Sequence, residues 1–166
     1  MTESNHRTRT FEWQDPVLSA QAVPQMSGLA FLQAIADGRL PQPPIAATLN
    51  YRLSSVSAGR VVFIGAPQEY HYNPIGTVHG GIAATLLDSA MACAVQTMLP
   101  QGAGYTTLEI KINYVRPILA GVGELQAIGE AIHVGRRVGT SEGRLVDAAG
   151  KLYAHGTTTC MIFPVA

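Results

Sequence analysis

The sequence is short of charge and has no excess of either sign. Only 13% of its 166 residues are charged, 11 basic residues balance 11 acidic ones, and the mean hydropathy is +0.16. A balanced chain produces no field that gathers nucleic acid or anionic lipid over one face, so neither partner is expected. Because a small domain with few charges is left with apolar surface to cover, we expect it to associate with copies of itself.

Disulfide, metal and targeting patterns are also missing. The two cysteines, Cys93 and Cys160, lie far apart, and neither has a neighbour at metal-ligand spacing. The first ten residues are polar, unlike a secretory signal. The longest weakly charged stretch, 82–98, contains Asp88 and falls short of the about 20 apolar residues that cross a bilayer. These absences predict a cytoplasmic protein with no metal and no membrane partner.

Prolines divide the chain into an N-terminal extension, 1–43, and a single domain, 44–166. Within the extension, apolar residues recur at helical spacing over 28–37, which predicts a short helix that ends at Gly38. The Pro-Gln-Pro-Pro run at 41–44 cannot lie inside a helix and therefore marks the boundary.

The rest of the chain predicts an α+β fold. Residues 48–66 form a predicted hairpin with its turn at 57–59, and about seventeen residues of helical character follow His79-Gly80-Gly81. Apolar and polar residues then alternate from Thr107 to Tyr114, and three more strands are expected at 123–134, 138–147 and 151–163. With no further helix between them, the strands must pair mostly antiparallel. We expect a sheet of five to six strands wrapped around one long central helix.

Asp88 is the leading candidate for chemistry. No other residue of 82–99 is charged, and no lysine or arginine occurs from 61 to 110. An aspartate inside a helix costs up to about 0.7 kcal/mol relative to alanine. A solvent-facing position would explain Asp88, but the residues on its helical face, at 81, 84, 85 and 92, are small and leave room for a ligand or a partner.

The glycines at the start of the same helix provide a second candidate. Gly80 and Gly81 allow the first-turn amides to approach a ligand, and these amides can polarise a carbonyl. Alternatively, the pair serves only the conformation of a turn. Asp88 follows Gly80 by eight residues, a little over two helical turns, so one carbonyl cannot contact both in the same chain. A second subunit could bring the carboxylate of Asp88 to the helix start.

The segment 73–95, NPIGTVHGGIAATLLDSAMACAV, resembles the hotdog-fold acyl-CoA thioesterases, in particular the branch of the phenylacetate-degradation thioesterase. The later segments INYVRPILAG, HVGRR and DAAGKLYAHGTTT resemble downstream strands of the same family. The resemblance covers roughly residues 44–163. It implies a side-by-side homodimer with a continuous sheet, often a dimer of dimers, with active sites at the dimer interface.

The resemblance also implies roles for individual residues. Asp88 would be the catalytic carboxylate, acting as nucleophile or as general base on water. The Gly80 amide would polarise the thioester carbonyl, with Asn73 and His79 lining the site from the partner subunit. Thr107 falls where related enzymes carry a serine or threonine that orients the water or the carboxylate.

The implied substrate is an acyl-CoA or aryl-CoA, hydrolysed to the free acid and coenzyme A without a separate cofactor. Arg116, Arg136 and Arg137 are candidates for its phosphates, because guanidinium groups match phosphate geometry and 136–137 falls on the family's Gly-Arg position. Three alternatives stay open: a non-catalytic acyl-CoA binding or sensing protein, a hotdog dehydratase or hydratase, and a purely structural oligomer.

Overall fold

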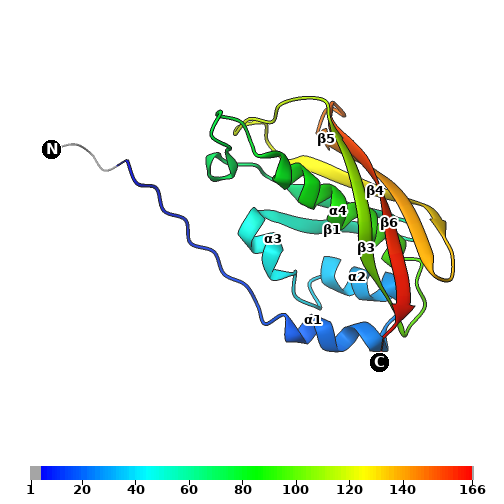
Figure 1. Cartoon of the computed structure of the whole chain (residues 1–166). Helices are drawn as coiled ribbons and strands as arrows, with labels where there is room; N and C mark the ends of the chain where they lie inside the picture. Colours follow the sequence, from blue (N-terminus) through cyan, green and yellow to red (C-terminus); the bar gives the residue numbers. More distant parts are fainter. Residues whose placement is uncertain (1–4, 166) are drawn as a thin grey trace.

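The computed structural model describes residues 5–165 and shows one six-stranded sheet wrapped around a long helix (Figure 1). The sheet has the order β1-β2-β4-β5-β6-β3, and all neighbouring strands are antiparallel. The strands are β1 (Tyr51–Ser57), β2 (Arg60–Gly65), β3 (Ala103–Tyr114), β4 (Leu125–Val134), β5 (Val138–Asp147) and β6 (Leu152–Pro164). The predicted α+β class and central helix are confirmed. Residues 1–4 of the predicted extension and residue 166 lie outside the described residues.

The central helix, α4 (Gly80–Gln96), lies against the concave face of the sheet. Its inward side chains are buried, with Leu86, Leu87 and Met91 at most 1% exposed. The approach is closest at Gly129 of β4, where a Cβ atom would lie 2.2 Å from the carbonyl oxygen of Ala90. A glycine is therefore required there, and the close approach holds the backbone of α4 against β4.

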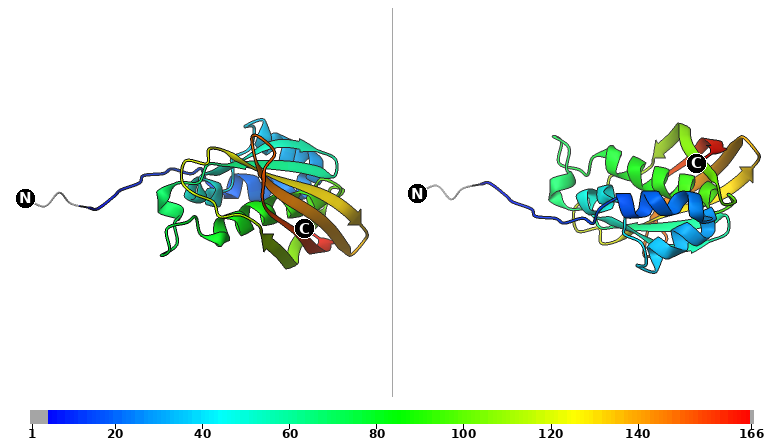
Figure 2. Two further views of the ribbon diagram at one scale, coloured as in Figure 1. Left: turned by 90° about the horizontal axis from the view of Figure 1, so that it is seen from above. Right: turned by 90° about the horizontal axis from the view of Figure 1, so that it is seen from below.

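The N-terminal extension contains more helix than the sequence predicts. Alongside the expected helix, α2 (Gly28–Ala36), the structure has α1 (Val17–Ala22) and a short 3-10 turn, η1 (Val23–Gln25). The Gly28 amide donates a hydrogen bond to the carbonyl of Leu99, 3.0 Å away, so α2 begins against the end of α4. Residues 5–15 form no helix or strand, and the chain extends toward the N-terminus beyond the helices and strands (Figure 2). Arg9 in this segment still contacts the fold, because its guanidinium donates hydrogen bonds to the carbonyls of Ala47 and Thr48 and lies 4.3 Å from the centre of the Tyr70 ring.

The predicted strand from Thr48 is wrong at its start. Thr48 belongs to a helix, α3 (Pro44–Leu49), whose last turn closes at Asn50 in the left-handed conformation, with φ 55° and ψ 52°. Proline suits the first turn of a helix and asparagine tolerates the left-handed region, so the sequence supports a helix of six residues here. The strand β1 then begins at Tyr51.

A β-bulge in β3 overturns the simple alternation predicted there. The register shifts between Thr107, which pairs with Cys160, and Glu109, which pairs with Thr159, so Leu108 is the extra residue. Strict alternation would place Thr107 on the same face as Glu109. The bulge instead turns Thr107 toward the central helix, because an extra residue reverses the facing of the strand.

Candidate active site

The side chains of Asp88 and Thr107 meet between the central helix and β3. The Thr107 hydroxyl donates a hydrogen bond to Asp88 Oδ1, with Oγ1 and Oδ1 3.0 Å apart. Asp88 is half-buried, and no described residue forms an ion pair with it. Its carboxylate therefore has one oxygen oriented by a neutral donor and is not neutralised by a cation, which suits a nucleophile or a general base.

Neutral groups surround this carboxylate. The thiol of Cys93 lies 3.7 Å from the hydroxyl of Tyr105, and the hydroxyl of Tyr51 lies 3.4 Å from that of Ser89. Burial, followed by smaller contributions that include the charge of Asp88, raises the pKa of Cys93 to about 12 and also raises the pKa of Tyr105. Both groups stay protonated at neutral pH, so these two side chains add no second charge near Asp88.

His79 has a structural role at the start of α4. Its Nδ1 accepts a hydrogen bond from the Gly81 amide, 2.9 Å away, so the imidazole caps the helix. The preceding amide, that of Gly80, has no acceptor among the described residues and sits at the positive end of the helix dipole. The ring of Tyr114 lies against Gly80, 3.2 Å from where a Cβ would be.

Asn73 holds the loop that leads into α4. Its Oδ1 accepts hydrogen bonds from the amides of Ile75 and Thr77, each 3.1 Å away, and its Nδ2 donates to the Thr77 hydroxyl at 2.9 Å. The side chain therefore orders the turn that ends at Gly76, which has a φ of 82°. One Nδ2 hydrogen is left for a ligand.

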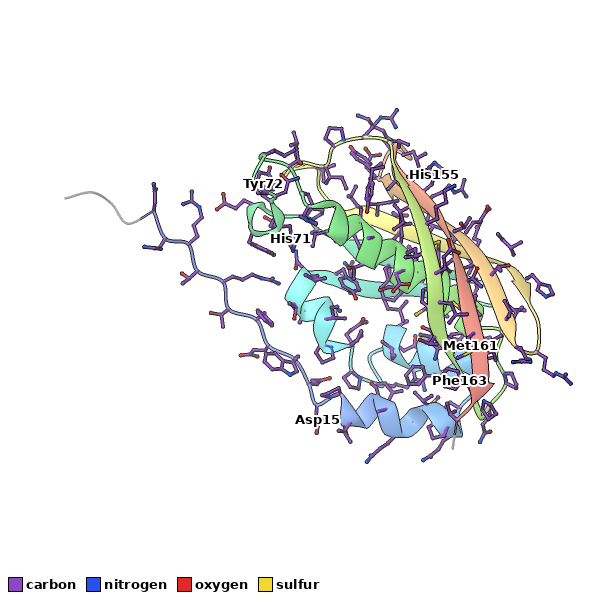
Figure 3. The ribbon with its side chains drawn as sticks, viewed as in Figure 1. Asp15, His71, Tyr72, His155, Met161 and Phe163 are labelled. Atoms are coloured by element: carbon purple, nitrogen blue, oxygen red, sulfur yellow. The ribbon has the colours of Figure 1, made fainter. Side chains whose placement is uncertain are left out.

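His71, close to Asn73 in the sequence, is expected to pack rather than to bind a ligand, and the structure buries it. It ends the 3-10 turn η2 (Glu69–His71), next to Tyr72 before the start of α4 (Figure 3), and is only 6% exposed. Its carbonyl accepts the His79 amide at 2.8 Å, and its Nδ1 accepts the Gln68 amide at 3.0 Å. The pattern of hydrophobicity could not show this, because the contact depends on the loop conformation.

The three arginines lie in two places. Arg116 lines a groove of about 340 Å³ together with Asn73, Gly80 and Tyr114, and it also donates to the carbonyl of Leu152. Arg136 and Arg137 instead line an open cavity of about 660 Å³ at the other end of α4, beside the end of β6, where Figure 3 labels Met161 and Phe163. Within one protomer, only Arg116 is therefore near the Gly80 amide.

Among residues 5–165 no group of three or more histidine, cysteine, aspartate or glutamate side chains could hold a metal ion. In the same residues, no helix combines the length and the apolar character needed to span a bilayer.

Residues 75–154, which include Gly80, Asp88 and Thr107, match the family model of the Thioesterase superfamily. A Halobacterium salinarum protein named as an esterase is 39% identical over 84 residues, which cover 49% of this chain and 54% of that protein. Human acyl-coenzyme A thioesterase 13 is 31% identical over 108 residues, which cover 64% of this chain and 76% of the human protein.

A solved structure agrees with these sequence relatives. The phenylacetic acid degradation-related protein of Ralstonia eutropha JMP134 superposes with a TM-score of 0.70 and 32% identity, covering 78% of this chain and 98% of that one. This chain thus spans about half the length of its archaeal relative but nearly the whole of the solved neighbour. Together with the sheet wrapped around α4, these similarities show that the chain has the hotdog fold and belongs to the Thioesterase superfamily.

Proposed function

We propose that this protein hydrolyses an acyl-CoA or aryl-CoA thioester to the free acid and coenzyme A, with Asp88 as the catalytic carboxylate. The observation that carries the proposal is the half-buried Asp88 carboxylate, oriented by Thr107 and free of any cationic partner in the described chain. The relatives support the substrate class, since one is named acyl-coenzyme A thioesterase and another is related to phenylacetic acid degradation.

The site needs two subunits. Eight residues of α-helix separate Gly80 from Asp88, which is about 12 Å at 1.5 Å per residue, too far for both to contact one carbonyl. Among residues 5–165 no strand pairs with the outer edge of β3, and Leu108 on β3 is 60% exposed. An unpaired edge of twelve residues favours pairing with a second copy. We infer a homodimer that brings Asp88 of one protomer to Gly80 of its partner, with a dimer of dimers as the larger assembly.

The chemistry follows from this arrangement. The Gly80 amide polarises the thioester carbonyl and stabilises the oxyanion, while Asn73 and His79 line the same end of the site. Asp88 either attacks the carbonyl carbon, giving a mixed anhydride that water then opens, or removes a proton from an attacking water. In both routes the C–S bond breaks, and coenzyme A leaves as the thiolate and gains a proton. Neither route requires a metal or a separate cofactor.

The remaining groups serve binding. Arg116, in the groove beside Gly80, is placed to meet a phosphate of coenzyme A, and Arg136 and Arg137 offer further guanidinium groups at the far cavity. A coenzyme A thioester is an intracellular substrate, so the proposed location is the cytoplasm, where the free thiols of Cys93 and Cys160 would stay reduced.

Thiol release from a panel of acyl-CoA and aryl-CoA substrates tests the proposal. We expect hydrolysis by the wild type and a loss of about 10²- to 10⁴-fold in Asp88→Asn, the range for removing one general base. Glu142→Gln, which removes an exposed carboxylate on β5, is the matched control and should retain activity. Tight binding of acyl-CoA without thiol release would instead identify a binding or sensing protein, and an active Asp88→Asn would remove Asp88 from the mechanism.

A further inference from the structure

The N-terminal extension closes the open side of the wrapped sheet. The sheet ends at two edges, β1 and β3, and α4 lies on its concave face between them. The extension contacts both edges, because α2 packs against β1 and η1 contacts β3. The segment therefore bridges the two edges on the same side of the sheet as the central helix.

A largely apolar pocket of about 230 Å³ lies beneath this bridge. The extension and the proline run at 41–44 supply the outer wall, where Phe31 and Ile35 of α2 face Phe63 of β2. The inner wall comes from Cys93 and Gln96 of the central helix. Phe31, Ile35 and Phe63 are each at most 8% exposed, so the walls are firmly packed.

The polar groups of the outer wall hold the wall together. The Ser19 hydroxyl donates to the carbonyl of Pro41 at 3.1 Å, which ties α1 to the proline run. The side chain of Gln42 pairs with both backbone groups of Leu53, accepting from its amide at 3.0 Å and donating to its carbonyl at 3.4 Å. Because these polar groups are hydrogen-bonded to the backbone, the pocket presents mainly hydrocarbon to a ligand. Its prolines are rigid and lose little conformational entropy when a ligand binds.

Asp88 does not line the pocket, but Cys93, which does, is close enough for the charge of Asp88 to act on its thiol. Cys93, on the inner wall of the pocket, contacts the hydroxyl of Tyr105, which lies two residues before Thr107 on the helix-facing side of β3. Along α4, Cys93 follows Asp88 by five residues, about 7.5 Å of axial rise. A thioester carbonyl held at Asp88 would therefore have the pocket within reach of its acyl group.

We propose that the N-terminal extension is the element that selects the acyl group: the pocket between α2, β2 and α4 takes the hydrocarbon end of the substrate's acid portion. The inference rests on the proposed thioesterase function. The volume of about 230 Å³ is below the 300–1,000 Å³ typical of sites for drug-sized ligands. The occupant is thus a compact hydrocarbon group, and a long fatty chain does not fit inside.

A substrate series with pocket variants tests this assignment. For the wild type, we expect kcat/KM to rise from acetyl-CoA to octanoyl-CoA and to rise no further at palmitoyl-CoA, with phenylacetyl-CoA showing whether a ring is accepted. Ser19→Phe fills the pocket and should lower the octanoyl-to-acetyl ratio of kcat/KM at least tenfold. Each methylene that is kept out of the pocket lowers kcat/KM by roughly fourfold. Phe31→Leu enlarges the pocket and should move the optimum to a longer chain. Gln21→Phe, at an exposed position of the same helix α1, should leave the ratio unchanged.

The outcomes separate the two proposals. If the wild type hydrolyses acyl-CoA in an Asp88-dependent way but neither Ser19→Phe nor Phe31→Leu changes the chain-length profile, the pocket assignment is wrong and the proposed function stands. If the wild type hydrolyses none of the substrates, both the proposed function and the pocket assignment are wrong. If Ser19→Phe does not fold, the chain-length profile of Phe31→Leu tests the pocket assignment by itself.

Discussion

The contact between Thr107 and Asp88 is where single residues determine the chemistry. The hydroxyl of Thr107 orients one oxygen of the carboxylate at 3.0 Å, and the other oxygen is left for water or the thioester carbon. A hydrogen bond to a charged group contributes about 1.5–3 kcal/mol, and removing the Thr107 hydroxyl should cost a free energy of this size.

We therefore predict that Thr107→Val lowers kcat/KM by roughly tenfold to a hundredfold, and that Thr107→Ser restores most of the activity. Steady-state kinetics on one acyl-CoA measure the effect, with the melting temperature as a check on folding. Thr106→Val, at an exposed position on the other face of β3, should behave as the wild type. Equal losses in Thr106→Val and Thr107→Val would mean that the strand, rather than this hydroxyl, is responsible.

The sequence predicted Asp88 because its charge is isolated within an apolar helix. It could not predict from alternation that Thr107 faces Asp88, since the bulge at Leu108 depends on pairing with β6. Only the family resemblance pointed to Thr107. The capping of α4 by His79 and the turn held by Asn73 likewise depend on loop geometry. The catalytic and binding roles of these residues stay predictions.

At the scale of elements, the segment before α4 determines where the Gly80 amide lies. The turn η2 and the following loop are joined to the helix start by the hydrogen bond from the His79 amide to the His71 carbonyl. Burial, together with the nearby Arg9 cation, lowers the pKa of His71 below its ordinary value of 6.5. The neutral imidazole is thus the form that the folded segment requires.

Stability should consequently depend on pH through His71. Because its folded-state pKa is lowered, the stabilisation is fully present above pH 6.5 and is lost as the pH falls through the folded-state value, where the unfolded chain binds the proton more readily. Chemical denaturation at a series of pH values between 7.5 and 5 should show the free energy of unfolding falling over this range. His71→Gln should flatten that slope, whereas His155→Gln, at an exposed position of β6, should keep it. An unchanged slope in His71→Gln would contradict the assignment.

The strands and the longer helices were predictable, whereas the short helices were not. The central helix and the six strands repeat their pattern often enough to be recognised, apart from the start of β1. The helices α1 and α3 have six residues each, fewer than two turns, so no periodicity distinguishes them from loop. α3 packs against β1, and α1 contacts η1 and is tied to the proline run by the Ser19 hydroxyl, so both helices depend on the folded chain.

In the proposed mechanism, the assembly of two protomers brings the catalytic groups together. One protomer places Gly80 and Asp88 on the same helix, separated by about 12 Å of axial rise, and no strand of the described part of the chain pairs with the outer edge of β3. The low charge of the chain already indicated self-association. The sequence could not indicate how the extension closes the sheet, because that requires Gly28 to meet the end of α4.

The most direct test mixes two variants that each lack one half of the site. Asp88→Ala removes the carboxylate, and Gly80→Pro removes the amide at the first helical position, where proline is tolerated. Gly80→Ala, which keeps the amide, is the control for added bulk beside Tyr114. If each site combines Asp88 of one protomer with Gly80 of its partner, unfolding and refolding the two inactive variants together restores activity. Random pairing gives up to about a quarter of the wild-type rate, since half of the dimers are mixed and each mixed dimer has one intact site. Mixed dimers that form but show no thiol release would contradict the shared site.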